Sequence, residues 1–266
     1  MHDEGSVATN NKLLALLRDG HSAVGGWCHL ADSMAAEITG RLDVDYVVID
    51  MQHGTASQSG IISMLQALSA TGTTPLVRIP HQDYGLAQRL LDAGAEGLIV
   101  PLVNNRADAE AAASAVRYPP LGGRSFGPVR SQMVLGRDTE HVNSQILCLV
   151  QIETREAMGN LDEIVNTPGI DGVYVGPADL ALTHGLSIKR QEPELDKLFD
   201  LVLEACSRAG TIPGIHCYSG ESAKRAQNQG FRVTSVGSDA VWLRAGYGEQ
   251  LALARGAEHQ AAGGYY

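Results

Sequence analysis

One alternation of segment types recurs along nearly the whole chain and limits the folds open to it. Eight short apolar runs, rich in Val and Ile, are typical of buried β-strands. They lie at residues 23–30, 45–53, 75–80, 97–103, 146–153, 172–179, 211–217 and 232–240. Most of the gaps carry apolar residues at three-to-four spacing, which predicts helices, as in 31–40, 59–71, 84–95, 108–118 and 193–210.

Strands that are apolar on both faces and alternate with helices indicate a parallel sheet. Eight such units in 266 residues fit one (β/α)8 barrel domain that spans residues 1–266. An open doubly wound sheet is the alternative. It is disfavoured because no GxGxxG turn follows the first strand.

Two segments depart from this rhythm. Residues 117–138, between the fourth and fifth strands, are rich in Pro, Gly and Arg and lack helical periodicity. We expect an irregular insert there that covers one rim of the barrel, because long structureless inserts in compact domains are usually functional. The C-terminal stretch predicts a helix for subunit packing, followed by a tail near residues 257–266.

Charge and cysteine content restrict the cell compartment and the partners. The formal net charge of −10 argues against binding nucleic acid or anionic lipid. No apolar run reaches the ~18 residues of a membrane span, and the acidic, polar N-terminus is not typical of a secretory signal. The four cysteines show no CxxC spacing, so we expect reduced core residues of a cytoplasmic protein at Cys28, Cys148, Cys206 and Cys217.

Polar side chains gather at the C-terminal ends of the predicted strands, where the active sites of barrels lie. They are Asp50 and His53 on the second strand, Arg78 on the third, Gln151 and Glu153 on the fifth, and Asp179 on the sixth. Side chains alternate along a strand, so Gln151 and Glu153 share one face. Together with Arg78 they are predicted to point into the mouth of the barrel.

The carboxylates of Glu153 and Asp179 would repel each other unless one took up a proton, paired with a cation or bound a metal. Two carboxylates with open positions beside them suit a hard divalent ion such as Mg²⁺ or Mn²⁺. Taken singly, Asp179 is more typical of a helix N-cap, and Glu153 could pair with Arg155. Their joint placement on one rim favours the metal pair.

The lysines argue against one kind of aldolase chemistry. A Schiff-base aldolase needs a desolvated lysine inside the barrel. None of the four lysines, Lys12, Lys189, Lys197 and Lys224, lies at the end of a predicted strand. A metal, an imidazole base and an arginine instead suit reactions that form an enolate next to a carboxylate.

Several motifs together resemble the HpcH/HpaI family of metal-dependent class II aldolases. They are "DYVVIDMQHG", "PLVRIP", "QRLLDAGAEGLIVPLVNN", "RYPPLGGRS", "VQIETREAMGNLDEI" and "GIDGVYVGPADL". The match as a whole runs in order from about Val24 to Leu243. The resemblance implies a (β/α)8 barrel that reversibly cleaves a 4-hydroxy-2-oxo acid to pyruvate and an aldehyde. It also implies a homo-oligomer, because members of the family form hexamers.

The resemblance implies a role for each matching residue. The metal ligands fall on Glu153 and Asp179, and the implied cofactor is Mg²⁺, Mn²⁺ or Co²⁺. The catalytic base falls on His53, with Asp50 as the carboxylate that orients it.

The remaining roles concern the pyruvate half of the substrate. The arginine that stabilises the enolate falls on Arg78, and the glutamine near pyruvate falls on Gln151. The backbone N–H groups that hold the pyruvate carboxylate fall on Ala178 and Asp179. The implied partners are a small 2-oxo acid and an aldehyde.

The chain departs from the family pattern at three places. Gln52 replaces an acidic residue beside the base, His216 and Cys217 follow the seventh strand where an aliphatic residue is common, and the insert reads "GGRSFGP". We expect these changes to lie around the aldehyde half of the substrate, so the aldehyde stays open. The alternatives are a related lyase that acts on an acyl-CoA thioester or decarboxylates oxaloacetate, and a non-catalytic barrel that binds a sugar acid.

Overall fold

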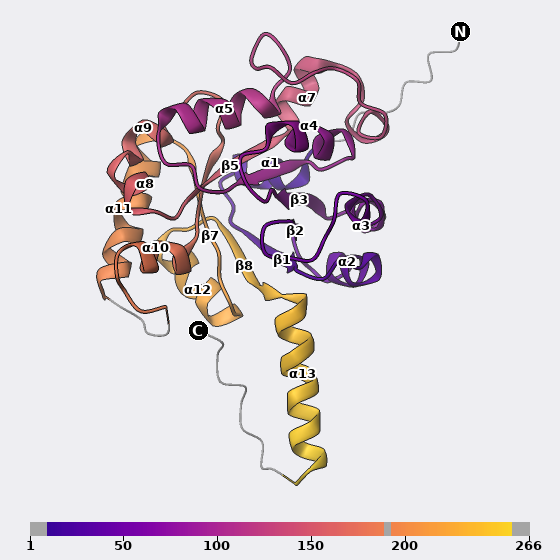
Figure 1. Cartoon of the computed structure of the whole chain (residues 1–266), viewed down its shortest axis with the longest axis vertical. Coiled ribbons are helices and arrows are strands. Elements are labelled where there is room, and N and C mark those ends of the chain that lie inside the picture. Colours follow the sequence, from indigo (N-terminus) through magenta and orange to yellow (C-terminus); the bar gives the residue numbers. More distant parts are fainter. Residues whose placement is uncertain (1–9, 189–192, 257–266) are drawn as a thin grey trace.

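The eight predicted strands form a closed parallel barrel in the computed structural model, which describes residues 10–188 and 193–256 (Figure 1). Each strand pairs with its neighbours in sequence, and β1 closes the ring on β8. The prediction of a (β/α)8 barrel is therefore confirmed. The strands are β1 (Ala23–Cys28), β2 (Tyr46–Asp50), β3 (Thr74–Arg78), β4 (Gly97–Val100), β5 (Leu147–Ile152), β6 (Gly172–Val175), β7 (Ile212–Ile215) and β8 (Val233–Ser238).

Helices surround the barrel (Figure 1). Five match predicted ranges: α2 (Ser33–Gly40), α3 (Gly60–Ser69), α4 (Tyr84–Asp92), α5 (Arg106–Val116) and α11 (Pro193–Ala209). The others in the described part of the chain are α1 (Lys12–Arg18), α6 (Gln132–Leu135), α7 (Thr139–Gln145), α8 (Arg155–Gly159), α9 (Leu161–Val165), α10 (Pro177–Thr183), α12 (Gly220–Gln229) and α13 (Asp239–Ala254).

The alternation of side chains along each strand creates two apolar cores. On β2, Val47 and Ile49 pack outward against the helices, whereas Tyr46 and Val48 pack inside the barrel. Leucines of α1 join the inner cluster, so this short helix closes the end of the barrel at which the strands begin. The opposite end, at which the strands finish, is left to polar residues such as Asp50.

The insert at residues 117–138 lies at the end of the barrel where the strands begin. Arg124 forms an ion pair with Asp92 at the end of α4, and Arg130 donates to the carbonyl of Ala93 and to Ser69 Oγ at the end of α3. Helices of a barrel run antiparallel to its strands, so these contacts hold the insert near the N-terminal ends of the strands. Arg124 and Arg130 bind the C-terminal ends of helices there. The expectation that the insert borders the aldehyde half of the substrate is therefore wrong for this chain taken by itself.

The last helix stands apart from the barrel. Figure 1 shows α13 projecting beyond the other helices, and none of its residues is buried. The predicted tail near residues 257–266 lies outside the described residues. In the described part of the chain, no helix has the length and apolar character that crossing a membrane requires.

The four cysteines behave as predicted from their apolar surroundings. Cys28, Cys148, Cys206 and Cys217 are all free and buried. Burial raises the pKa of Cys148 to about 12, which keeps its thiol protonated at neutral pH. The cysteines are therefore packing residues of the core.

Candidate active site

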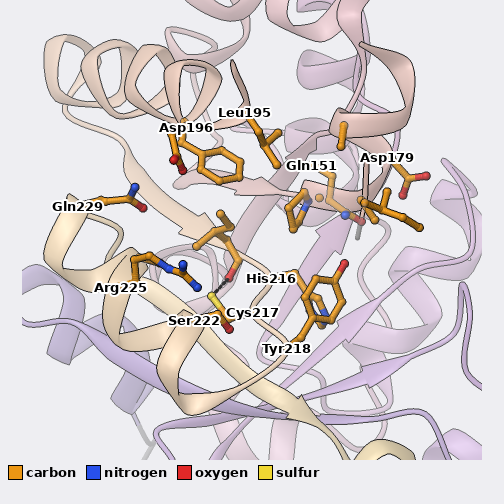
Figure 2. Close-up of a pocket in the computed structure, with 18 of the residues that line it drawn as sticks. Gln151, Asp179, Leu195, Asp196, His216, Cys217, Tyr218, Ser222, Arg225 and Gln229 are labelled. Atoms are coloured by element: carbon orange, nitrogen blue, oxygen red, sulfur yellow. Dashed lines mark hydrogen bonds between the residues drawn. The ribbon is translucent and has the colours of Figure 1, made fainter. Parts of the chain in front are cut away.

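A cavity of about 630 Å³ opens at the C-terminal ends of the strands. One part of it extends between α11 and α12, where Figure 2 shows Asp196 on one side and Arg225 and Gln229 on the other. The other part reaches the predicted rim. Five predicted site residues line the cavity, namely His53, Arg78, Gln151, Ala178 and Asp179. Asp50 and Glu153 are buried behind this lining, at 0% and 1% exposure.

Asp50, the last residue of β2, is held by three side chains. Its carboxylate accepts two hydrogen bonds from the guanidinium of Arg78, at 2.9 Å from Nε and 2.5 Å from Nη2. Asp50 Oδ2 also accepts a bond from Trp27 Nε1 at 3.2 Å and lies 3.1 Å from His29 Nε2. Burial alone would raise the pKa of Asp50, but the bonds from His29 and Arg78 outweigh it and hold that pKa well below its usual range. Asp50 is therefore an anion at neutral pH.

The structure places the peptide N–H of His53, and not its imidazole, at the carboxylate of Asp50. The role of Asp50 as the carboxylate that orients the base stays a prediction. Asp50 Oδ1 accepts the backbone N–H groups of Gln52 and His53, at 2.9 and 3.2 Å. Within the described residues, the ring of His53 makes no hydrogen bond or ion pair, although it lines the cavity. The reason is local, because the chain bends directly after β2 and turns its peptide N–H groups toward the carboxylate.

Glu153 is anchored by two donors just beyond the end of β5. Its Oε1 accepts the backbone N–H of Leu102 at 2.7 Å, and its Oε2 accepts Gln151 Nε2 at 2.9 Å. Burial raises the pKa of Glu153 to about 7, against the opposing effect of the Leu102 bond and with a further rise from the charge of Asp179. Leu102 adopts φ 55°, which is strained for a leucine, so the backbone is bent to make this contact.

The turn from β6 into α10 leaves room for these carboxylates. A side chain on Gly176 would place its Cβ 2.6 Å from Glu153 Oε2, so any residue larger than glycine would force the Glu153 carboxylate to move. Asp179 lies in the first turn of α10, inside the helix and not at its N-cap, which is Gly176. No side chain caps this helix, so its first N–H groups, including those of Ala178 and Asp179, stay at the cavity wall.

An aromatic wall completes the cavity beside β7 and β1. The ring of His216 packs edge-on against Trp27, at 4.6 Å between centroids, and against Tyr218, at 4.9 Å. His216 Nδ1 lies 3.3 Å from Ser235 Oγ. Burial, helped by the charge of Arg78, lowers the pKa of His216 to about 3, so this imidazole is neutral at physiological pH.

Sequence reasoning missed His29, Trp27 and Leu102. His29 and Trp27 could have been found from the alternation of side chains along the first strand. Trp27 packs inside the barrel and Cys28 packs against the helices, so His29 is the next side chain on the inner face. The contact of Leu102 has no signal in the sequence, because it depends on a backbone conformation that leucine rarely adopts.

The barrel carries its polar cavity at the C-terminal rim, where the active sites of barrel enzymes lie. Comparison with known proteins is consistent with this. The chain is 40% identical over 248 residues to a hydroxypyruvate/pyruvate aldolase of Rhizorhabdus wittichii, covering 92% of this chain and 99% of the relative. It is 36% identical over 251 residues to a 4-hydroxy-2-oxo-heptane-1,7-dioate aldolase of Salmonella paratyphi A, covering 93% and 95%.

Solved structures share the fold. A HpcH/HpaI aldolase/citrate lyase family protein of Burkholderia cenocepacia superposes with a TM-score of 0.85 at 31% identity, covering 92% of this chain and all of that one. A more distant barrel is the citrate lyase beta subunit of M. tuberculosis complexed with oxaloacetate and magnesium. It has a TM-score of 0.54 at 19% identity, with 85% of this chain and 93% of that one covered.

The family model for HpcH/HpaI aldolase/citrate lyase matches residues 24–245. The chain belongs to this family, and it is an enzyme, a lyase of the aldolase type. The resemblance drawn from the motifs is thereby confirmed. A barrel that only binds a sugar acid is set aside.

Proposed function

We propose that this enzyme reversibly cleaves a 4-hydroxy-2-oxo acid to pyruvate and an aldehyde. The observation that carries the proposal is that two pairs of hydrogen-bonded side chains lie at one cavity. Arg78 is fixed by the carboxylate of Asp50, and the second carboxylate, Glu153, is held beside Gln151. The first pair suits a developing enolate oxygen, and the second suits a metal that would bind the 2-oxo acid. The names of the two aldolase relatives support the same reaction class.

Glu153 and Asp179 fit a divalent cation. Asp179 is near enough for its charge to raise the pKa of Glu153. A cation between the two carboxylates would lower that pKa again. Gln151 Oε1 is buried with no hydrogen-bond partner among the described residues, so an acceptor oxygen is left beside the pair. Such a set of oxygen donors suits Mg²⁺, Mn²⁺ or Co²⁺, and the magnesium in the citrate lyase beta subunit supports this choice. A bound ion would polarise the 2-oxo group and share the negative charge of the enolate.

The other residues of the cavity act on the pyruvyl half. Arg78 uses Nε and Nη2 to bind Asp50, which leaves Nη1 for the enolate oxygen. The backbone N–H groups of Ala178 and Asp179 hold the carboxylate of the substrate, and Gln151 lies beside them. Substrate binding thus needs no positively charged side chain other than Arg78.

His53 is the base that removes the proton from the C4 hydroxyl. It lines the same cavity, and no bond to a described residue occupies its ring. When the proton leaves O4, the electron pair of the O4–H bond becomes the second C4–O4 bond of the aldehyde. The C3–C4 bond breaks, and its electron pair forms the C=C bond of the pyruvate enolate as the 2-oxo oxygen takes up the negative charge. Decarboxylation of oxaloacetate passes through the same enolate and is the second candidate activity, supported by the oxaloacetate in the citrate lyase beta subunit.

We further propose that the enzyme is a cytoplasmic homo-oligomer. Its free, buried cysteines suit a reducing compartment. The exposed apolar side chains of α13, such as Tyr247 at 68% and Leu251 at 51%, suit contact with another copy of the chain. A hexamer is the arrangement implied by the family resemblance.

Metal removal tests the proposed chemistry directly. Chelation should abolish release of pyruvate from 4-hydroxy-2-oxo acids, and Mg²⁺, Mn²⁺ or Co²⁺ should restore it. Glu153→Ala and Asp179→Ala should mimic chelation, and both should lower the affinity for Mn²⁺ measured by calorimetry. Full activity of metal-stripped protein would contradict the proposal, as would trapping of a pyruvate adduct on a lysine by borohydride.

A further inference from the structure

His29 is the imidazole that the buried carboxylate of the site holds. Its Nε2 lies 3.1 Å from Asp50 Oδ2, and its side chain is 31% exposed where it lines the cavity. The carboxylate accepts the Nε2 proton, so Nδ1 is the nitrogen that can take up a proton. This is the arrangement in which a carboxylate fixes the tautomer and the orientation of a histidine.

His29 also has a fixed relation to the group proposed to hold the enolate oxygen. Arg78 Nη2 and His29 Nε2 bind the same atom, Asp50 Oδ2, at 2.5 and 3.1 Å. The two side chains are therefore neighbours across one carboxylate oxygen. His53 follows the bend after β2, and it meets Asp50 through its backbone N–H; within the described residues its ring has no bond to the carboxylate that holds Arg78.

The proposed reaction needs two separate proton transfers. Cleavage removes a proton from O4 of the substrate, and the resulting enolate becomes pyruvate only after C3 has gained a proton. The second transfer happens at a carbon next to the enolate oxygen, on the side of the substrate that Arg78 holds. C3 and O4 are both bonded to C4 before cleavage and belong to separate molecules after it, so the second transfer can use a group other than the one that serves O4.

We propose that His29 is a second catalytic histidine, which carries the proton to and from C3 of pyruvate, while His53 serves O4. The inference rests on the proposed aldol function and assigns a residue to a step which that function leaves open. In cleavage, the imidazolium of His29 gives its Nδ1 proton to C3, and the enolate C=C electrons form the new C–H bond as the C=O is restored. In the aldol direction, neutral Nδ1 removes a proton from the methyl group of pyruvate.

The protons balance across one turnover. His53 gains the O4 proton and releases it to water, and His29 takes a proton from water to replace the one given to C3. His216 is unsuited to this work although it lies nearby, because burial lowers its pKa to about 3 and its cationic form is disfavoured. His29, in contrast, is partly exposed where it lines the cavity and is held by the Asp50 carboxylate through Nε2.

Exchange of the methyl protons of pyruvate isolates this step, because it needs no aldehyde. The Mn²⁺-loaded enzyme and pyruvate are mixed in D₂O, and deuterium in the methyl group is followed by mass spectrometry. His29→Gln keeps an amide N–H donor for Asp50 but cannot carry a proton, so exchange should fall about 10²-fold. The affinity for pyruvate, measured by calorimetry, should stay close to that of the wild type.

Two further variants separate catalysis from positioning. His29→Ala should lose exchange as His29→Gln does, and added imidazole should restore part of it, because a free base can enter the space that the ring has left. His81→Gln is the matched control, since His81 follows β3 near the same rim but does not line the cavity. It should exchange at the wild-type rate.

The outcomes are distinct. If His29→Gln exchanges protons at the wild-type rate, or clearly faster than His29→Ala, an N–H donor to Asp50 is enough for exchange. His29 then only positions Asp50, and the proposal fails. If both variants lose pyruvate binding together with exchange, His29 is structural and the proposal also fails. If the wild-type enzyme neither exchanges pyruvate protons nor cleaves any 4-hydroxy-2-oxo acid, the proposed function itself fails.

Discussion

At the scale of single residues, the site depends on how Asp50 divides its bonds. A carboxylate that accepts both Nε and Nη2 of an arginine fixes the plane of the guanidinium as well as its charge. The same guanidinium lies over the ring of Trp27, at 5.0 Å from Cζ to the centroid, which restricts it further. Arg78 is therefore preorganised before any substrate arrives, as stabilisation of a developing charge requires.

This geometry predicts the behaviour of Arg78 variants. Arg78→Ala should lower kcat about 10²-fold or more while weakening pyruvate binding less, because the enolate oxygen carries more charge than the ketone oxygen. Arg78→Lys should recover only part of kcat, since a point charge cannot bind Asp50 and the substrate as a fork does. Steady-state kinetics check both variants. A raised KM with unchanged kcat would reduce Arg78 to a binding residue.

The role of His53 can be separated from that of the metal by comparing two reactions. Aldol cleavage needs the C4 hydroxyl proton removed, whereas decarboxylation of oxaloacetate has no such proton. His53→Ala should therefore lose cleavage by about 10²-fold or more, while CO₂ release from oxaloacetate continues with the same Mn²⁺. If the two activities fall together, His53 helps to build the site and does not act as the base.

At the scale of elements, the sequence was informative where burial imposes a pattern. The strands were predictable because they are short continuous apolar runs, and five helices because their apolar residues recur every third or fourth position. Helix α1 was not, because seven residues are too few to establish a period. The position of the insert was not predictable either, since it depends on Arg124 and Arg130 meeting helix ends that are remote in sequence.

The site, too, has features that a sequence pattern predicts and features that it does not. The residues at strand ends were predicted from parity and rim placement, and most of them do line one cavity. That Asp50 binds the peptide N–H of His53 could not be predicted, because a pattern places His53 near the carboxylate but does not say whether its ring or its peptide N–H faces it. Only the bend after β2 decides this.

The junction of β6 and α10 gives a prediction of its own. In Gly176→Ala, the new Cβ would meet Glu153 Oε2 at 2.6 Å and Gln151 Nε2 at 3.2 Å, so the carboxylate must move. The affinity for Mn²⁺ should fall about tenfold or more, as when other groups that orient a metal ligand are changed. Gly159→Ala in α8 is the control, because its Cβ would meet nothing within 4 Å. Equal Mn²⁺ affinities in the two variants, measured by calorimetry, would contradict a metal at Glu153.

At the scale of the whole molecule, α13 is the element that the barrel does not explain. It has 16 residues, none of them buried, and an isolated helix of this length is only marginally stable in water. Its exposed side chains include Trp242, Leu243, Tyr247, Leu251 and Leu253. A helix with this composition needs a partner surface, and the proposed homo-oligomer provides one.

This proposal predicts which substitutions change the assembly. The wild-type enzyme should behave as an oligomer in size-exclusion chromatography with light scattering. Replacing both Tyr247 and Leu251 by Glu should shift the protein to a smaller species, because two charges would then have to be desolvated in an apolar contact. Gln250→Glu adds a charge to the same exposed helix between these positions and serves as the matched control. A monomeric wild-type protein would contradict the proposal, and so would a double variant that keeps the wild-type mass.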